Sequence, residues 1–136
     1  MRVHVNPLIR RLEQIKTLQD AVEEAGKIES LFFPAPIRDT IPVVFFLNNG
    51  SVFQSSGGIG RRDEKGHFTT PFFRIETISD SFMVTLTLLK PHYGQAVPED
   101  LFDVYNLIKT GFCVEMNSTV FGGVQYLDSK LVEVKD

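Results

Sequence analysis

One stretch of the chain, residues 71–91, constrains the fold more than any other. It reads PFFRIETISDSFMVTLTLLKP and contains two runs in which apolar side chains alternate with other side chains. A period of two over runs this long predicts β-strands and not a helix. Ser79, Asp80 and Ser81 between the runs favour a turn, and the prolines at the two ends are expected to stop the ladder. The stretch therefore predicts an antiparallel hairpin.

The two faces of this hairpin are expected to differ. The apolar face would carry Phe73, Ile75, Phe82, Val84, Leu86 and Leu88. The opposite face would carry Arg74, Glu76, Thr85 and Thr87. One face is apolar enough to pack on a core and the other face is polar, which predicts a half-buried hairpin. Nothing in the hairpin is typical of a catalytic centre.

Composition limits the classes of function. A chain of 136 residues suits one domain, with room for an appended N-terminal element. A formal net charge of −3 without a basic stripe predicts no nucleic-acid binding, and no run is apolar enough to span a membrane. The N-terminus lacks the features of a secretory signal, which predicts synthesis in the cytoplasm. The single cysteine, Cys113, excludes an intramolecular disulfide and a multi-cysteine metal site.

Three segments are expected in chain order. Residues 1–33 form an N-terminal helical segment, residues 34–42 a proline-rich linker, and residues 43–136 a β domain. The helix has an apolar stripe at spacings of three and four, made of Leu8, Leu12, Ile15, Leu18, Val22 and Ala25. Glu23 is expected on its solvent face. The stripe could dock on the chain's own sheet or on a partner's helix.

Further strands are expected on both sides of the hairpin. Residues 43–47 form a continuous apolar run, and the Asn-Gly turn after it favours a hairpin with residues 51–54. Residues 112–116 and 119–127 are strand candidates, the latter with a bulge or close backbone approach at Gly122 and Gly123, and residues 131–134 are an edge-strand candidate.

Between these strands, residues 55–66 are expected to form a mobile loop, and residues 92–100 a polar loop. A short helical turn is expected from Pro98 through Val104 and Tyr105. Six or seven short strands after one helix predict a mainly β fold, namely an antiparallel β-sandwich or jelly-roll-like domain with an N-terminal amphipathic α-helix.

No constellation of residues predicts an enzyme, a cofactor or a metal site. The glycine run at residues 57–60 lacks the following helix that a phosphate-binding loop needs. Cys113, within an apolar strand, favours an inert or half-buried thiol over a nucleophile activated by His67 or His92. The three histidines have no metal-ligand spacing. The residues alone favour an interaction or structural protein.

Four motifs in order carry a family resemblance: Asp39-Thr40-Ile41-Pro42 before an apolar strand, Phe72-Phe73-Arg74-Ile75-Glu76, Leu88-Leu89-Lys90-Pro91, and the stretch from Lys109 to Glu115 that runs on to Leu127. Residues 18–24 also look like the family's N-terminal helix. Across residues 12–132 the chain resembles the bacillus spore coat proteins CotY and CotZ and their exosporium relative ExsY.

The resemblance implies a structural protein that is made in the mother-cell cytoplasm and assembles into ordered layers on the spore surface. Its partners would be other copies of itself and other spore coat proteins. Family cysteines recur where this chain has Val120, Gly122 and Tyr126, and only Cys113 falls on such a position. A single thiol links at most two chains, so this cysteine-poor member would assemble by non-covalent contacts, or would have another role as a divergent relative.

Three functions stay open at this point. The leading one is a non-catalytic, self-assembling spore-envelope protein, with Cys113 as a candidate intermolecular thiol and a contact face made of Arg74, Glu76, Thr85 and Thr87. The second is a monomeric β-sandwich module that binds a glycan or peptide through residues 57–67. The third is a cysteine-dependent enzyme.

Overall fold

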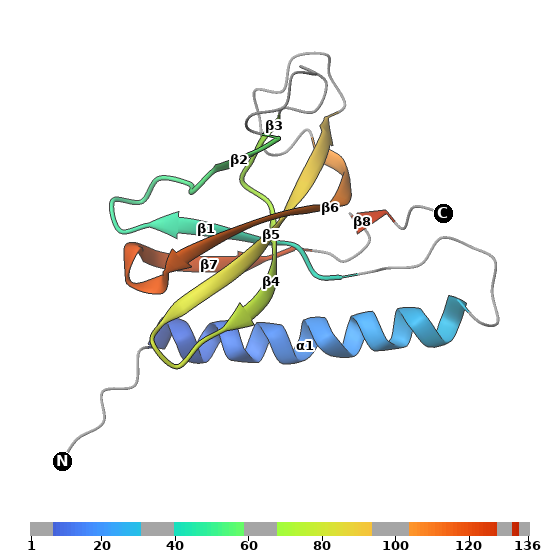
Figure 1. Ribbon diagram of the computed structural model, residues 1–136, viewed down its shortest axis with the longest axis horizontal. Helices are drawn as coiled ribbons and strands as arrows, with labels where there is room; N and C mark the ends of the chain where they lie inside the picture. The colour runs from blue at the N-terminus through green and yellow to red at the C-terminus, as the bar shows by residue number, and fades with distance from the viewer. Residues whose placement is uncertain (1–6, 31–39, 59–67, 94–103, 128–131, 134–136) are drawn as a thin grey trace.

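One long helix precedes eight strands in the described part of the chain (Figure 1). The computed structural model describes residues 7–30, 40–58, 68–93, 104–127 and 132–133. In chain order the elements are α1 (Pro7–Ser30), β1 (Val43–Leu47), β2 (Ser55–Gly57), β3 (Phe68–Thr70), β4 (Phe73–Ile78), β5 (Met83–Tyr93), β6 (Val104–Asn117), β7 (Phe121–Tyr126) and β8 (Val132–Glu133).

Six of these strands form one sheet, in the order β7-β1-β4-β5-β6-β8. All neighbours in it are antiparallel except the short pair β6 and β8. Strands β2 and β3 form a separate antiparallel pair that contacts β5 and β6, where Phe68 packs near Phe112. The expected mainly β fold, with antiparallel sheets and one N-terminal helix, is confirmed.

The central hairpin is β4 and β5, paired antiparallel as expected. Its apolar face is confirmed: Phe73, Ile75, Val84 and Leu86 are fully buried and Leu88 is 1% exposed. These side chains form the main core together with residues of β1, β7 and α1. The period of two therefore identified both the strands and the face that meets the core.

The expected stop at Pro91 is wrong, because β5 continues to Tyr93 and Pro91 is paired with Leu107 of β6. The Leu89 N–H donates to the Phe72 carbonyl on the β4 side of β5. Strand geometry turns the nitrogen of Pro91, two residues on, to the same side, away from β6. A residue without an N–H therefore costs the β5–β6 ladder no hydrogen bond there.

Phe82 was expected on the core face, and this is wrong. It lies in the turn between β4 and β5 with φ +66° and is 40% exposed. The Ser79 N–H donates to the Met83 carbonyl and closes the turn, so the strand begins at Met83. A left-handed backbone at a phenylalanine is sterically unfavourable and is held here by the hairpin closure.

Helix α1 docks on the chain's own sheet, which settles the question of cis or trans docking (Figure 1). Strands β1 and β4 pair at one position, Val43 with Phe73. The helix contacts both β4 and β7. Leu12 and Ile15 enter the main core, 0% and 4% exposed. The helix thus seals the sheet on the side where β4 lacks a strand partner.

The expected helix stripe is wrong in its second half. Leu18 is 47% exposed, whereas Gln19, one residue on, is completely buried. Glu23, one turn further, also faces inward and was expected on the solvent face. A side chain four residues after Ile15 shares its face, so Gln19 continues the buried row that Leu12 and Ile15 begin.

Several local expectations are confirmed at the sheet's other strands. The register of β1 against β7 shifts at Gly122, as expected for a bulge, and an added Cβ there would lie 3.2 Å from the Leu47 carbonyl oxygen. Asn117 and Ser118 form the expected turn, which opens a short 3-10 helix. The edge strand expected at residues 131–134 is β8.

Other local expectations are confirmed only in part or are wrong. The Asn-Gly turn reverses the chain as expected, since the Leu47 N–H donates to the Ser51 carbonyl, the Phe53 N–H donates to the Phe45 carbonyl, and Val52 bridges Phe46. This pairing is too short to form a strand at residues 51–54, and the next strand begins at Ser55, within the expected loop. Residues 59–67 and 94–103 lie outside the described part of the chain. The expected helical turn at Val104 and Tyr105 is instead the start of β6. Long-range pairing with β5 overrides the local helical signal there.

The sheet is buried on both faces along β1, which accounts for its unbroken apolar run. Val43 and Phe45 belong to the main core, while Val44 belongs to a second cluster with Phe72, Leu89 and Leu107. Because neighbouring residues of a strand point to opposite faces, a strand covered on both sides needs apolar residues at every position.

Candidate interaction surface

The polar face of the central sheet is built from three adjacent strands, β4, β5 and β6. Cross-strand pairing aligns Arg74 with Thr87 and Thr87 with Cys113. Thr85 pairs with Glu115 of β6 in the same way. The residues expected to form a contact face therefore share one surface with the only cysteine: Arg74, Glu76, Thr85, Thr87 and Cys113.

Arg74 is the centre of an ion-pair network that joins this surface to α1. Its Nε and Nη2 each donate to a carboxylate oxygen of Glu23 at 2.7 Å, and its Nη1 donates to Glu76. The side chains of Arg74 and Glu23 are only 13% and 14% exposed, against 43% for Glu76. A bidentate, largely buried pair of this geometry holds the helix in a defined position on the sheet.

The electrostatic balance at Glu23 favours its charged form. Burial raises the pKa of its carboxyl group, but hydrogen bonds from Arg74 and Thr40, and the charges of Arg74 and Lys109, outweigh burial. The pKa of Glu23 is therefore lower than its ordinary value of 4.5. The hydrogen bond to Glu23 raises the pKa of Arg74, more than burial lowers it. Both partners stay charged at neutral pH.

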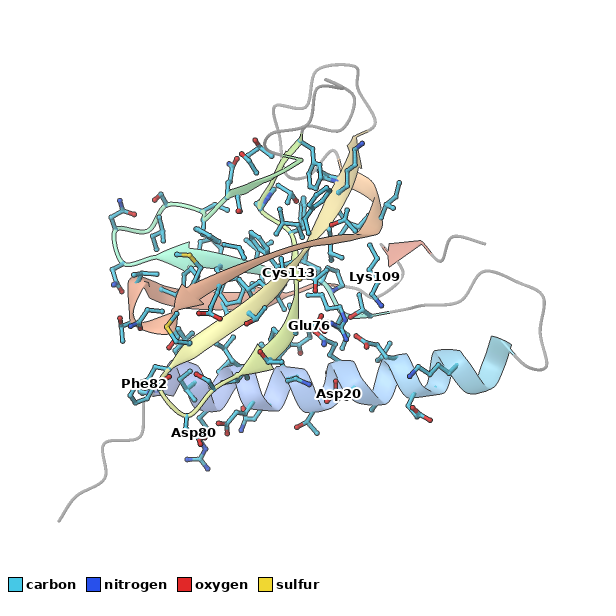
Figure 2. The ribbon with its side chains drawn as sticks, in the orientation of Figure 1. Asp20, Glu76, Asp80, Phe82, Lys109 and Cys113 are labelled. Atoms are coloured by element: carbon cyan, nitrogen blue, oxygen red, sulfur yellow. The ribbon has the colours of Figure 1, made fainter. Side chains whose placement is uncertain are left out.

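Thr87 connects the ion pairs to Cys113. Its two neighbours in this chain of contacts, Glu76 and Cys113, are labelled in Figure 2. Its hydroxyl donates to a Glu76 carboxylate oxygen at 2.7 Å and lies 3.8 Å from the Cys113 Sγ. Thr87 itself is 4% exposed because these neighbours cover it. The accessible part of the surface is therefore formed by Glu76, Cys113 and the exposed residues of β6.

Cys113 is an exposed free thiol. Its apolar neighbours predict an inert or half-buried thiol, and the predicted burial is wrong. Alternation along β6 explains this, since Phe112 and Val114 face the core and Cys113 faces away. His67 lies outside the described residues, as does the side chain of His92. Within the described ranges, no three His, Cys, Asp or Glu side chains come together as metal ligands.

Gln19 is a residue that sequence reasoning missed. Its Nε2 donates to the Ile75 carbonyl at 2.7 Å, and its Oε1 accepts from the Ile75 N–H at 3.0 Å. The amide thus takes the place of a neighbouring strand on the open side of β4. The signal available in the sequence is the position of Gln19, four residues after Ile15 and four before Glu23.

No helix in the described ranges is both long and apolar enough to cross a membrane. The chain is 29% identical over 131 residues to spore coat protein Z of Bacillus subtilis (strain 168), and the similarity covers 89% of this chain and 88% of that protein. No family model matches the chain. No solved structure matches it either.

Proposed function

We propose that the chain is a member of the CotY/CotZ family of spore coat proteins, and that it is a structural, non-catalytic spore-envelope protein that self-associates through its β domain. The observation that carries the proposal is the similarity to spore coat protein Z across 89% of the chain. Because the similarity leaves out only about a tenth of either protein, it relates nearly the whole of both chains.

The proposal includes a place and partners. The protein is synthesised in the mother-cell cytoplasm and deposited on the spore surface, where it contacts copies of itself and other spore coat proteins. The face with Glu76, Thr85 and Cys113 is its candidate contact surface, and Arg74 and Thr87 support that surface from beneath. Arg74 holds Glu76 in place and Thr87 lies between Glu76 and Cys113.

Self-association of this kind rests on non-covalent contacts. The chain has one cysteine, so oxidation of Cys113 joins chains in pairs and cannot extend a network by itself. Exposed polar side chains and strand edges must therefore supply the remaining contacts.

The test is the oligomeric state of the purified protein with and without reductant, alongside the variant Cys113→Ser. We expect concentration-dependent assemblies by light scattering and electron microscopy in both redox states, and equally in Cys113→Ser. In the wild type, oxidation adds disulfide-linked pairs on denaturing gels. A strict monomer at high concentration, without localisation to spores, would contradict the proposal. Tight binding of such a monomer to a cell-wall glycan would favour the binding-module alternative.

A further inference from the structure

Helix α1 buries one side and leaves the opposite side uncovered. Its buried row is Leu12, Ile15 and Gln19. Because a helix turns about 100° per residue, a second row lies half a turn away from the buried one. The members of this outward row are all exposed, and they are Arg10, Gln14, Thr17, Ala21 and Glu24. Figure 1 shows α1 along one border of the molecule, with no described element on its outer side.

The two ends of the outward row carry opposite charges. Arg10 and Glu24 are about 21 Å apart along the helix axis, at about 1.5 Å per residue. Neither side chain makes an ion pair with another described residue, whereas Glu23, next to Glu24, is paired with Arg74. Arg10 also lies in the first turn, where the helix dipole is unfavourable to a cation. Its position therefore does not stabilise α1 itself and suits a negatively charged partner.

The middle of the outward row can receive a second helix. Thr17 Oγ1 donates to the Glu13 carbonyl oxygen of its own helix at 2.9 Å, so this hydroxyl already has a hydrogen-bond partner. Ala21, one turn further on, is small and lets a second helix approach closely. Leu18 lies beside the row and is 47% exposed, although it is large and apolar. A helix packed here would remove Leu18 from water.

We propose that the outward row of α1 packs antiparallel against the same row of a second copy, about a twofold axis at Thr17. This inference rests on the proposed function and names one of its contacts. Thr17 is midway between Arg10 and Glu24, so each Arg10 lies opposite the partner's Glu24, and the symmetry makes this pair twice. The two Leu18 side chains lie beside the axis and contact each other.

Charge selects the antiparallel arrangement. Parallel packing of the same rows would set Arg10 against Arg10 and Glu24 against Glu24, and would align the two helix dipoles. Antiparallel packing pairs opposite charges and opposes the dipoles. A twofold contact closes on itself, so this one makes dimers. The polar face with Glu76, Thr85 and Cys113 stays free for the second, different contact that a layer needs.

The first test reverses the two charges, singly and together, and measures the dimer dissociation constant by sedimentation. At about 0.15 M salt, charges more than about 8 Å apart are largely screened. Arg10→Glu and Glu24→Arg each replace two attractions with two repulsions, and each should weaken the dimer about tenfold. The double variant R10E/E24R restores opposite charges and should return the constant to within about threefold of wild type.

Arg11→Glu is the matched control for these variants. Arg11 is exposed in the same part of the helix and carries the same charge, but it points about 100° away from Arg10 around the helix. Its reversal should change the dissociation constant less than about threefold, since it is off the outward row.

A cysteine on the axis tests the geometry directly. Because Thr17 lies opposite itself, Thr17→Cys in the Cys113→Ser background should form a disulfide-linked dimer on mild oxidation. Asp80→Cys in the same background, in the exposed β4–β5 turn, is the control and should form disulfides only at the slow rate of random collision. Equal rates for the two cysteines would contradict an axis at Thr17.

Circular dichroism and thermal unfolding of each variant separate loss of the contact from loss of the fold. In dilute, monomeric protein Arg10→Glu should not lower the melting temperature, because an acid suits the start of a helix. Single reversals that behave like Arg11→Glu, or a double variant that stays weak, would overturn the α1 pairing and leave self-association itself intact. A wild-type protein that is monomeric at every concentration would instead contradict the proposed function, and this inference with it.

Discussion

Residues on the two faces of the central hairpin have different roles. On one face Leu86 is fully buried among aromatic and aliphatic side chains. On the other, Arg74, Glu76 and Thr87 are joined by hydrogen bonds that run from α1 to Cys113. The alternation of the sequence distinguishes the faces, but only the packing shows that the polar one is largely occupied by partners within the chain.

The contrast between neighbours on β5 leads to a stability prediction. Leu86→Ala leaves a cavity in the core and should lower the free energy of unfolding by about 2–5 kcal/mol. Thr85→Ala, on the half-buried polar face, should cost no more than about 0.5 kcal/mol. Thermal unfolding of both variants measures the difference, and equal losses would show that the two faces are wrongly assigned.

At the scale of the element, α1 acts as a substitute strand as well as a core element. Strand β4 has β5 on one side, and on the other side the amide of Gln19 satisfies both backbone groups of Ile75. A polar residue in the middle of a buried helix face is normally unfavourable, but here both of its hydrogen-bonding groups have partners.

Gln19 and its neighbour Leu18 allow a paired prediction. Gln19→Leu removes both partners of a buried backbone unit and should destabilise the protein by about 1–3 kcal/mol, although it makes the helix more apolar. Leu18→Gln is the matched control, and should change stability by at most about 0.5 kcal/mol because Leu18 is 47% exposed. Urea denaturation measures both, and a cost for Leu18→Gln equal to that of Gln19→Leu would contradict the assigned helix face.

At the scale of the whole molecule, the Glu23–Arg74 pair makes stability depend on pH. The pKa of Glu23 is lowered in the folded state, so its contribution is fully present above the unfolded value of about 4.5 and is lost as the pH falls through the folded value. Protonation releases the bidentate contact between α1 and the sheet. Acid should therefore weaken the docking of the helix.

The corresponding prediction compares Glu23→Gln with wild type from about pH 5 to about pH 2. The wild type should lose unfolding free energy more steeply over this window, and the two curves should converge at the acidic end. Glu13→Gln, at an exposed position of the same helix, should follow the wild-type slope. Parallel curves for wild type and Glu23→Gln would show that the pair does not link protonation to folding.

Local patterns alone predicted a large part of this molecule. The alternation in residues 71–91 predicted the central hairpin, the glycines at 122–123 predicted the bulge, and the apolar spacing after Pro7 predicted the helix. Each of these depends on backbone geometry over a few residues, so neighbours in the sequence contain the necessary information.

Tertiary structure decided which of these surfaces are covered. Helix α1 could bury either Leu18 or Gln19. Gln19 is the buried one because its amide hydrogen-bonds the N–H and the carbonyl of Ile75. Thr87 is covered and Cys113 is exposed because strands distant in the sequence pair around them. Burial and hydrogen-bond satisfaction depend on residues far along the chain. The sequence therefore predicted most elements and most of their apolar faces, whereas the contacts between elements could be read only from the fold.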